Sequence, residues 1–172
     1  MLPLARFSDR IIATHDIPPR PAKMAALPNA LHPALRSALA ARGMTELYSH
    51  QAAFFDAAAE GNNVVITTGT ASGKSLAFLL PILQGILQDP SARAFLLYPT
   101  KALGHDQLRA LHALLDEVSA AGGRRIEAGV YDGDTPPTER RRIRERANLV
   151  LTNPDMLNTG MVPMHARQGF SH

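Results

Sequence analysis

One short segment of the sequence carries residue types that could bind a phosphate. Residues 68–75 read Thr-Gly-Thr-Ala-Ser-Gly-Lys-Ser, so a run of small residues leads directly into a lysine and a serine. Small residues let successive backbone N–H groups surround a phosphate, and the start of a following helix adds its positive dipole end. Lys74 would contact the outer phosphates as a cation, and the Ser75 hydroxyl would reach Mg²⁺. The segment predicts a phosphate-binding loop, although Thr68 stands where the usual pattern has its first glycine.

The elements expected around this segment are those that a phosphate loop needs. A β-branched run at residues 63–67 predicts a strand before it, and an apolar stretch from Lys74 to about Gln88 predicts a helix after it. Three more strands and two more helices are expected at residues 93–98, 126–131 and 148–152, and at residues 101–120 and 137–146. Strands that alternate with helices of this length predict an α/β fold with a mostly parallel sheet flanked by helices. The loops after the strands then lie along one sheet edge, where such folds bind ligands.

The region before the loop predicts an arm followed by two helices. Residues 1–27 contain four prolines and no sustained hydrophobic period, which predicts an extended arm. Leucines at four-residue spacing then predict a helix that ends near Gly43. These leucines are Leu31, Leu35 and Leu39. A second helix is expected over residues 49–60, with Ser49 as its N-cap and Gly61 at its end.

Length and composition exclude several classes of protein. A chain of 172 residues, 45% hydrophobic and 19% charged, suits a single globular domain, which we place at residues 28–172. Without cysteine there is no disulfide framework, thiol nucleophile or cysteine-ligated zinc. No apolar run approaches the roughly 18–20 residues that span a bilayer, so we expect no membrane partner and a cytoplasmic location. The net charge of +3 is too small to indicate nucleic acid by itself.

Five arginines are concentrated between Glu139 and Arg146. The favoured interpretation is a solvated helix face, on which Glu139 and Glu145 form ion pairs with arginines three or four residues away. A role of this run in binding nucleic acid stays open at this point.

Further segments appear in a recognisable order along the chain. Leu47-Tyr-Ser-His-Gln51 precedes the phosphate loop, and three segments follow the later strands. These are Tyr98-Pro-Thr-Lys-Ala-Leu-Gly-His-Asp-Gln107, Tyr131-Asp-Gly-Asp-Thr-Pro136 and Leu151-Thr-Asn-Pro-Asp-Met-Leu157. Over residues 17–163 the ordered set resembles the first RecA-like lobe of superfamily-two DEAD/DEAH-box helicases. The residues of these motifs are similar to those of the YprA/MrfA branch of DNA helicases linked to repair.

The resemblance implies an ATP-dependent DNA helicase of 3′→5′ direction, with ATP and Mg²⁺ held between two RecA-like lobes. It places the side chain of Gln51 at the adenine edge, because an amide both donates and accepts hydrogen bonds. It assigns Thr100, Lys101 and Thr152, with nearby backbone, to the phosphates of one strand of single-stranded or duplex DNA. Such contacts are independent of base sequence. A protein partner is not identified.

The full nucleotide set implied by the resemblance and the loop consists of eight residues. They are Gln51, Gly69, Thr70, Ala71, Ser72, Gly73, Lys74 and Ser75. Lys74 and Ser75 are also the candidate catalytic residues, and Ser75 is the candidate Mg²⁺ ligand.

Plainer interpretations exist for the residues when each is taken alone. Gln51 can be an exposed helical glutamine, and Lys101 a solvated residue of a first helical turn. Asp132-Gly133 and Asn153-Pro154-Asp155 are also ordinary turn and helix-start sequences.

One part that the resemblance requires is not found in the sequence. Residues 153–172 contain no apolar strand followed by an Asp-Glu pair, the acids that hold Mg²⁺ and position the attacking water. We therefore expect a lobe that is incomplete at its C-terminal side and does not turn over ATP alone. Three functions stay open: a helicase completed by further sequence, a non-catalytic nucleotide- and DNA-binding module and, less favoured, a P-loop kinase or transferase.

Overall fold

The computed structural model describes residues 10, 12, 13, 15, 16, 18, 21–70 and 72–164. Ala71, one of the expected nucleotide-binding residues, lies outside the described residues. The elements in chain order are β1 (Met24–Ala26), α1 (Pro33–Ala41), β2 (Glu46–Tyr48), α2 (Ser49–Ala59), α3 (Lys74–Gln88), β3 (Ala94–Leu97), α4 (Lys101–Ala120), β4 (Ala128–Val130), α5 (Pro137–Arg146), β5 (Leu149–Thr152) and α6 (Pro154–Met156). A π-helical turn, Leu157–Met161, and a 3₁₀ turn, Val162–Met164, follow α6.

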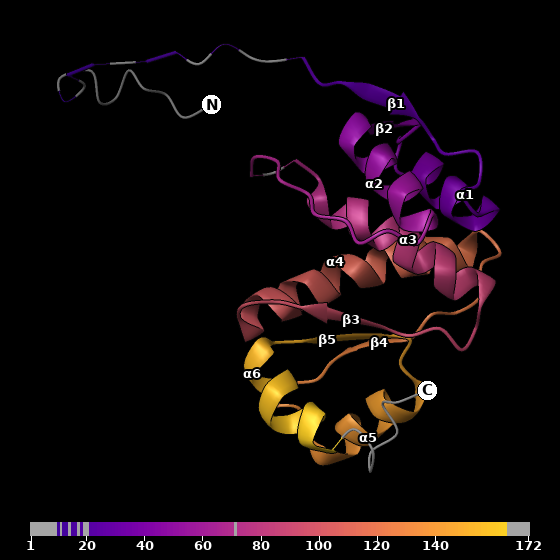
Figure 1. Ribbon diagram of the computed structural model, residues 1–172, viewed down its shortest axis with the longest axis vertical. Helices are drawn as coiled ribbons and strands as arrows, with labels where there is room; N and C mark the ends of the chain where they lie inside the picture. The colour runs from indigo at the N-terminus through magenta and orange to yellow at the C-terminus, as the bar shows by residue number, and fades with distance from the viewer. Residues whose placement is uncertain are drawn as a thin grey trace.

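Three parallel strands form the main sheet in the order β3-β5-β4. The central strand β5 is buried along its whole length, as expected for a parallel strand covered on both faces. Helix α4 lies over one face of the sheet, and α5 and α6 lie over the other (Figure 1). The expected α/β fold, with a mostly parallel sheet flanked by helices, is confirmed.

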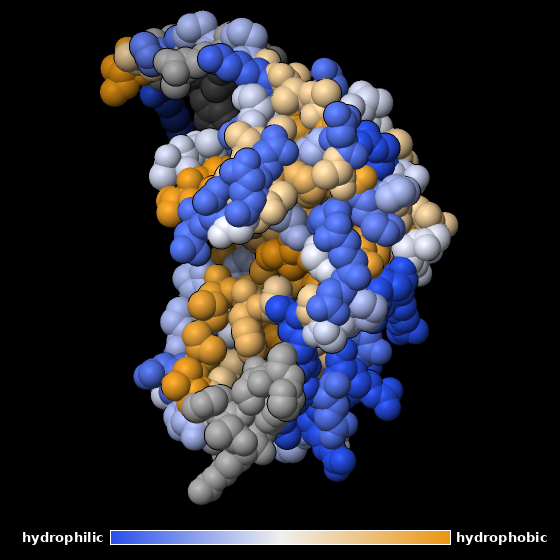
Figure 2. Space-filling model, turned by 45° about the vertical axis from the view of Figure 1, so that its right-hand side comes forward, coloured by the Kyte–Doolittle hydropathy of each residue, from blue (hydrophilic) through white to orange (hydrophobic). Residues whose placement is uncertain are grey.

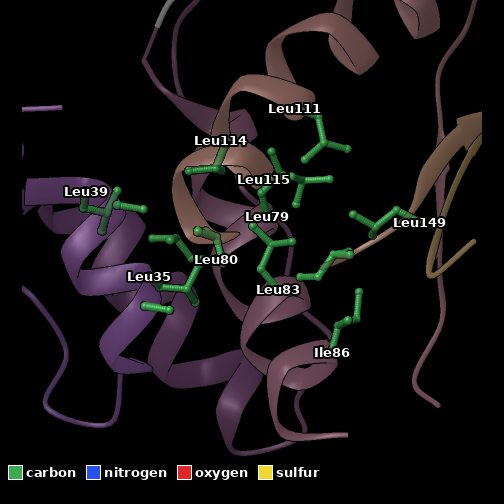
Figure 3. Close-up of a cluster of buried hydrophobic side chains, with 14 of the residues drawn as sticks. Leu35, Leu39, Leu79, Leu80, Leu83, Ile86, Leu111, Leu114, Leu115 and Leu149 are labelled. Atoms are coloured by element: carbon green, nitrogen blue, oxygen red, sulfur yellow. The ribbon is translucent and has the colours of Figure 1, made fainter. Parts of the chain in front are cut away.

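Alternate residues of β5 enter two separate hydrophobic cores, because successive strand side chains point to opposite faces. Leu149 and Leu151 belong to the larger core. Figure 3 shows Leu149 pointing toward leucines of α3 and α4, with the leucines of α1 on the far side of α3. Val150 points the other way, into a smaller core that contains Ile143 of α5 and Met161. Of the leucines expected on the first helix, Leu35 and Leu39 lie on α1 and Leu31 precedes it, but all three are in the larger core, at most 3% exposed.

A small antiparallel pair of strands joins the first part of the chain to the domain. β1 pairs with β2, so that Ala25 lies opposite Leu47. Residues 24–26, part of the expected arm, are thereby held beside α2. Neither strand was predicted, because three residues are too few to show a hydrophobic alternation. None of the helices in the described part of the chain is both long enough and apolar enough to span a bilayer.

The strand expected at residues 63–67 is not formed, so this prediction was wrong. These residues adopt no regular secondary structure, and Val65 is 87% exposed. β-branched residues favour an extended backbone, but a strand needs a neighbour for its N–H and C=O groups. No strand among the described residues pairs with this segment.

The surface differs between the two ends of the molecule. Figure 2 shows hydrophobic residues gathered at mid-height and hydrophilic residues toward the lower end, where Figure 1 places α5. The edge strand β3 also exposes Phe95 and Leu97, which are 42% and 49% accessible.

Candidate nucleotide and nucleic-acid site

The phosphate loop leads directly into α3, as expected. Gly73 is the N-cap of this helix and has a φ of +75°, in the left-handed region that favours glycine. A Cβ atom at this position would lie 2.5 Å from Nε2 of Gln51. Gly73 is therefore required for two reasons, its backbone conformation and the close approach of α2.

The side chain of Lys74 folds back into the loop that precedes it in the sequence. Its ammonium donates hydrogen bonds to the carbonyl of Thr68 at 2.9 Å, to the carbonyl of Gly69 and to Oγ of Ser72 at 3.3 Å. The hydroxyls of Thr68 and Ser72 are themselves 2.6 Å apart. The loop backbone thus curls around a cation at the N-terminus of a 15-residue helix.

Ser75 connects the phosphate loop to α4. Its hydroxyl donates to Oε1 of Gln107 at 3.3 Å, across 32 residues of sequence. Gln107 was not singled out from the sequence, although it ends one of the segments that carry the family resemblance. Its amide places a polar group beside the candidate Mg²⁺ ligand.

Gln51 is buried, with only 4% of its surface exposed, so the interpretation as an exposed helical glutamine is wrong. Its Oε1 accepts the backbone N–H of Tyr48 at 2.9 Å, and its Nε2 donates to the carbonyl of Gly73 at 3.0 Å. The first of these bonds caps α2. The N-cap is Tyr48, and the prediction of Ser49 as N-cap was wrong, because the capping acceptor comes from the third residue of the helix.

His50 is a second link between α2 and the phosphate loop that the sequence did not predict. Its Nε2 lies 2.9 Å from the carbonyl of Ser72. Its ring stacks on Tyr48, with the centroids 5.6 Å apart and the planes 13° from parallel. Two neighbouring side chains of α2 therefore hold two successive carbonyls of the loop.

The residues expected to contact nucleic acid meet at the carboxyl edge of the sheet, but they differ in exposure. Thr100 is exposed and caps α4 by accepting the N–H of Leu103 at 3.3 Å. Lys101, the first residue of α4, forms an ion pair with Asp134 at 2.7 Å. Thr152 is 4% exposed, and its hydroxyl donates to the carbonyl of Tyr131 at 2.6 Å. The Thr152 side chain thus ties β5 to the end of β4 in this structure.

The loop after β4 is organised by a buried carboxylate. Asp132 is 1% exposed, and its Oδ1 accepts hydrogen bonds from the N–H groups of Asp134 and Thr135 and from the Thr135 hydroxyl. Its Oδ2 lies 3.3 Å from Nε2 of His105. Burial raises the pKa of Asp132, but the hydrogen bonds from Thr135, Asp134 and His105 outweigh it and hold the pKa below 3.8. The turn expected at Asp132-Gly133 is present, with a carboxylate at its centre.

The arginine-rich helix α5 matches the favoured interpretation in part. Arg141 pairs with Glu145 at 2.7 Å, and Arg142 pairs with Glu139 at 3.0 Å, both on the exposed helix surface. Arg140 does something different. It donates to the carbonyls of residues 132 and 133, each at 2.9 Å, and lies over the ring of Tyr131 at 5.7 Å.

The opposite end of α5 is also held by an arginine that was not expected to take part. Arg93 donates to the backbone carbonyls of Ile143, Arg144 and Ala147. A cation at a helix C-terminus satisfies carbonyls that have no partner within the helix. Arginines thus fasten α5 to both the loop after β4 and the segment before β3.

Comparison with known proteins places this geometry in a family. A model of the DEAD/DEAH box helicase family matches residues 48–172. The chain is 41% identical over 160 residues to the ATP-dependent helicase YprA of Bacillus subtilis, covering 93% of the chain and 21% of YprA. It is 43% identical over 119 residues to the ATP-dependent helicase HRQ1 of Saccharomyces cerevisiae, covering 69% of the chain and 11% of HRQ1.

A solved structure shows the same likeness in three dimensions. The DUF1998 helicase MrfA bound to DNA and AMPPNP superposes with a TM-score of 0.86 at 38% identity, covering 98% of this chain and 24% of MrfA. The chain therefore spans about a fifth to a quarter of the length of YprA and MrfA. The expected RecA-like fold and the similarity to the YprA/MrfA branch are confirmed. The chain belongs to the DEAD/DEAH box helicase family.

Proposed function

We propose that this chain is the nucleotide- and DNA-binding part of the first lobe of an ATP-dependent DNA helicase. The observation that carries the proposal is the position of Lys74, whose ammonium lies within a loop at the N-terminus of α3. The names of YprA and HRQ1 as ATP-dependent helicases, and the binding of DNA and AMPPNP by MrfA, support it.

The groups around the loop fit a nucleotide triphosphate with Mg²⁺. An ammonium, a hydroxyl and the N-terminus of a long helix are the donors that a phosphate chain prefers. In this proposal Gly69, Thr70, Ala71, Ser72 and Gly73 contribute backbone N–H groups, and Lys74 and Ser75 contribute their side chains. Bound Mg²⁺ neutralises charge on the phosphates. Lys74 must exchange the carbonyls of Thr68 and Gly69 for phosphate oxygens, and Ser75 must turn away from Gln107.

Gln51 keeps capacity for an adenine edge even though both ends of its amide are engaged. A carboxamide has two N–H donors and two lone pairs on its oxygen. The bonds to Tyr48 and Gly73 use one lone pair and one donor, so one of each is left. The adenine of a bound nucleotide would then contact Gln51 itself, and its phosphates would contact the loop whose Gly73 is bonded to Gln51.

The sheet edge supplies the proposed contacts to nucleic acid. Thr100 and Lys101 stand at the N-terminus of the 20-residue helix α4, where backbone N–H groups and the helix dipole favour phosphate. Thr152 would act by holding the end of β4 in place and through the backbone that follows it. Phosphate contacts carry no base information, so binding is expected to be independent of sequence and to weaken steeply with salt. We also propose a cytoplasmic location, in keeping with a nucleic-acid partner.

ATP-driven unwinding, a DNA repair role and 3′→5′ movement are proposed for the longer protein of which such a lobe is part. The 172 residues contain no Asp-Glu pair after Thr152, so the acids that activate water in the family are not among them. The chain itself supplies the binding groups for ATP and for a nucleic-acid strand.

Calorimetric titration of the chain with ATP and Mg²⁺ tests the nucleotide part of the proposal. Lys74→Ala should weaken binding about ten- to hundredfold, because a charge-assisted contact is lost. Arg141→Ala is the control, since it also removes one positive charge and the Arg141 side chain, on α5, is 75% accessible. Equal affinity in the Lys74→Ala and Arg141→Ala variants would overturn the assignment of the phosphate loop.

A further inference from the structure

The proposed strand contact at Lys101 has an unusual electrostatic environment. The pKa of Lys101 lies above its ordinary value, first because its ammonium donates to Asp134 and then because of the charges of Asp134, Asp132 and Asp155. The cation that is expected to hold a phosphate is therefore paired with one carboxylate, and two more act on it electrostatically. Phosphate is an anion, so it must compete with them for Lys101.

The loop that carries Asp134 is held beside Lys101 by contacts of its backbone. The N–H of Asp134 donates to the buried carboxylate of Asp132 at 2.9 Å. Gly133 packs against the lysine, since a Cβ atom there would lie 3.4 Å from Nζ of Lys101. The carbonyl of Gly133 accepts a hydrogen bond from Arg140 at 2.9 Å. The backbone of the loop thus holds the Asp134 carboxylate beside Lys101.

The ion pair itself is exposed on both sides. The Lys101 side chain is 45% accessible and that of Asp134 is 76% accessible. Exposed ion pairs contribute little to stability, because water screens them and both side chains must be ordered. A phosphate that also reaches the N-terminus of α4 can therefore replace the Asp134 carboxylate.

Building on the proposed function, we propose that Asp134 is a competing anion at the strand-binding edge, which a DNA phosphate displaces from Lys101. Asp134 then sets how tightly this edge holds a strand. A bound strand gains the Lys101 contact only after the ion pair opens, and the ion pair re-forms when the phosphate leaves. The contact between Lys101 and a DNA phosphate is therefore weaker, and dissociates more readily, than it would if Asp134 did not pair with Lys101.

Fluorescence anisotropy of a labelled oligodeoxythymidylate, titrated with the full chain, tests this exchange. Asp134→Asn should tighten binding about two- to fivefold, the size expected when one exposed ion pair no longer competes. It should also steepen the salt dependence, because a freed lysine releases one more counterion on binding. Asp106→Asn is the matched control: it removes the same charge from α4 and frees Arg109 from an exposed ion pair.

The Lys101→Ala variant separates this inference from the proposed function. Asp134→Asn should have no effect when Lys101 is alanine, while Lys101→Ala alone weakens binding. If Asp134→Asn behaves like Asp106→Asn but Lys101→Ala still weakens binding, competition by Asp134 is refuted and the strand-binding edge stands. If Lys101→Ala changes nothing, the placement of the strand at this edge fails together with the inference. Unchanged thermal unfolding midpoints verify that each variant is folded.

Discussion

The phosphate loop and the loop after β4 are both folded by side chains, but the side chains stand in different relations to the proposed ligands. The phosphate loop curls around Lys74, the group that we propose binds the triphosphate. The loop at residues 131–135 is built on Asp132 and Arg140, neither of which has to bind anything. By this proposal the first loop rearranges when the triphosphate binds, whereas the second loop keeps its conformation. Substitutions should separate the two: removing the Asp132 carboxylate or the Arg140 guanidinium should reduce stability, and removing the Lys74 ammonium should reduce nucleotide binding.

The largest effect on stability is expected from Asp132→Ala. Removing this buried carboxylate leaves the N–H of Asp134 without its acceptor and the N–H of Thr135 with only the more distant carbonyl of residue 132, at 3.3 Å. The free energy of unfolding should fall by about 2–4 kcal/mol. Urea denaturation measures the change. His105→Ala is the control, because His105 is 57% exposed and contacts only one oxygen of Asp132 at 3.3 Å. A loss no larger than that of His105→Ala would mean that the carboxylate does not organise the loop.

Gly73→Ala should affect both stability and binding. The φ of +75° and the 2.5 Å approach to Gln51 predict a loss of about 1–3 kcal/mol in the free energy of unfolding. Gln51 should also be displaced, so nucleotide affinity measured by calorimetry should fall. At Gly69 a Cβ atom meets nothing within 4 Å, so Gly69→Ala is the matched control and should be better tolerated in folding. Equal stability of the two variants would argue against the close packing of α2 on the loop.

A smaller loss is expected when Arg140 is changed to lysine. Lysine keeps the charge but cannot reach both carbonyls with one planar group or stack on Tyr131 in the same way. The free energy of unfolding should fall by about 1 kcal/mol. Arg141→Lys on the same helix, where the arginine is exposed and pairs with Glu145, should leave urea denaturation unchanged. If Arg140→Lys and Arg141→Lys had the same free energy of unfolding, Arg140 would belong to the solvated face of α5.

The smallest expected effect is a dependence of stability on acid pH. The pKa of Asp132 is lower in the folded chain than its ordinary value of 3.8. The unfolded chain therefore binds a proton more readily, so this contribution is full above the ordinary pKa and is lost as the pH falls through the lower folded pKa. Urea denaturation across the acid range should show a shallower loss of stability in Asp132→Asn than in the unaltered chain. Parallel curves would remove Asp132 as a source of acid sensitivity.

Helices could be read from the sequence more fully than strands, because their signals are local. An apolar run, apolar residues on one helix face and a basic run predicted helices at 74–88, 101–120 and 137–146, the ranges that α3, α4 and α5 occupy. The run at residues 63–67 has the same kind of strand composition as β5. It forms no strand because pairing depends on a neighbour that local composition cannot reveal.

For the candidate site, the sequence predicted candidate residues but not the contacts between distant segments. Residue types predicted the phosphate loop, and the family resemblance pointed to Gln51 and Lys101. The sequence could not show that Asp134 reaches Lys101, because 33 residues separate them and only the parallel sheet brings their loops together. Nor could it show that the Thr152 hydroxyl is buried against Tyr131, because that contact depends on the register of β4 and β5.

Titration of the ¹⁵N-labelled chain with ATP and Mg²⁺, followed by amide NMR, tests the central claim most directly. We predict that the amide signals of residues 69–75 shift together with the side-chain amide of Gln51, while those of Asp134 and Thr135 stay in place. The shifts should vanish in Lys74→Ala and persist in Arg141→Ala. Shifts centred on residues 131–135, or shifts at residues 69–75 that survive Lys74→Ala, would contradict nucleotide binding by a loop that Lys74 releases.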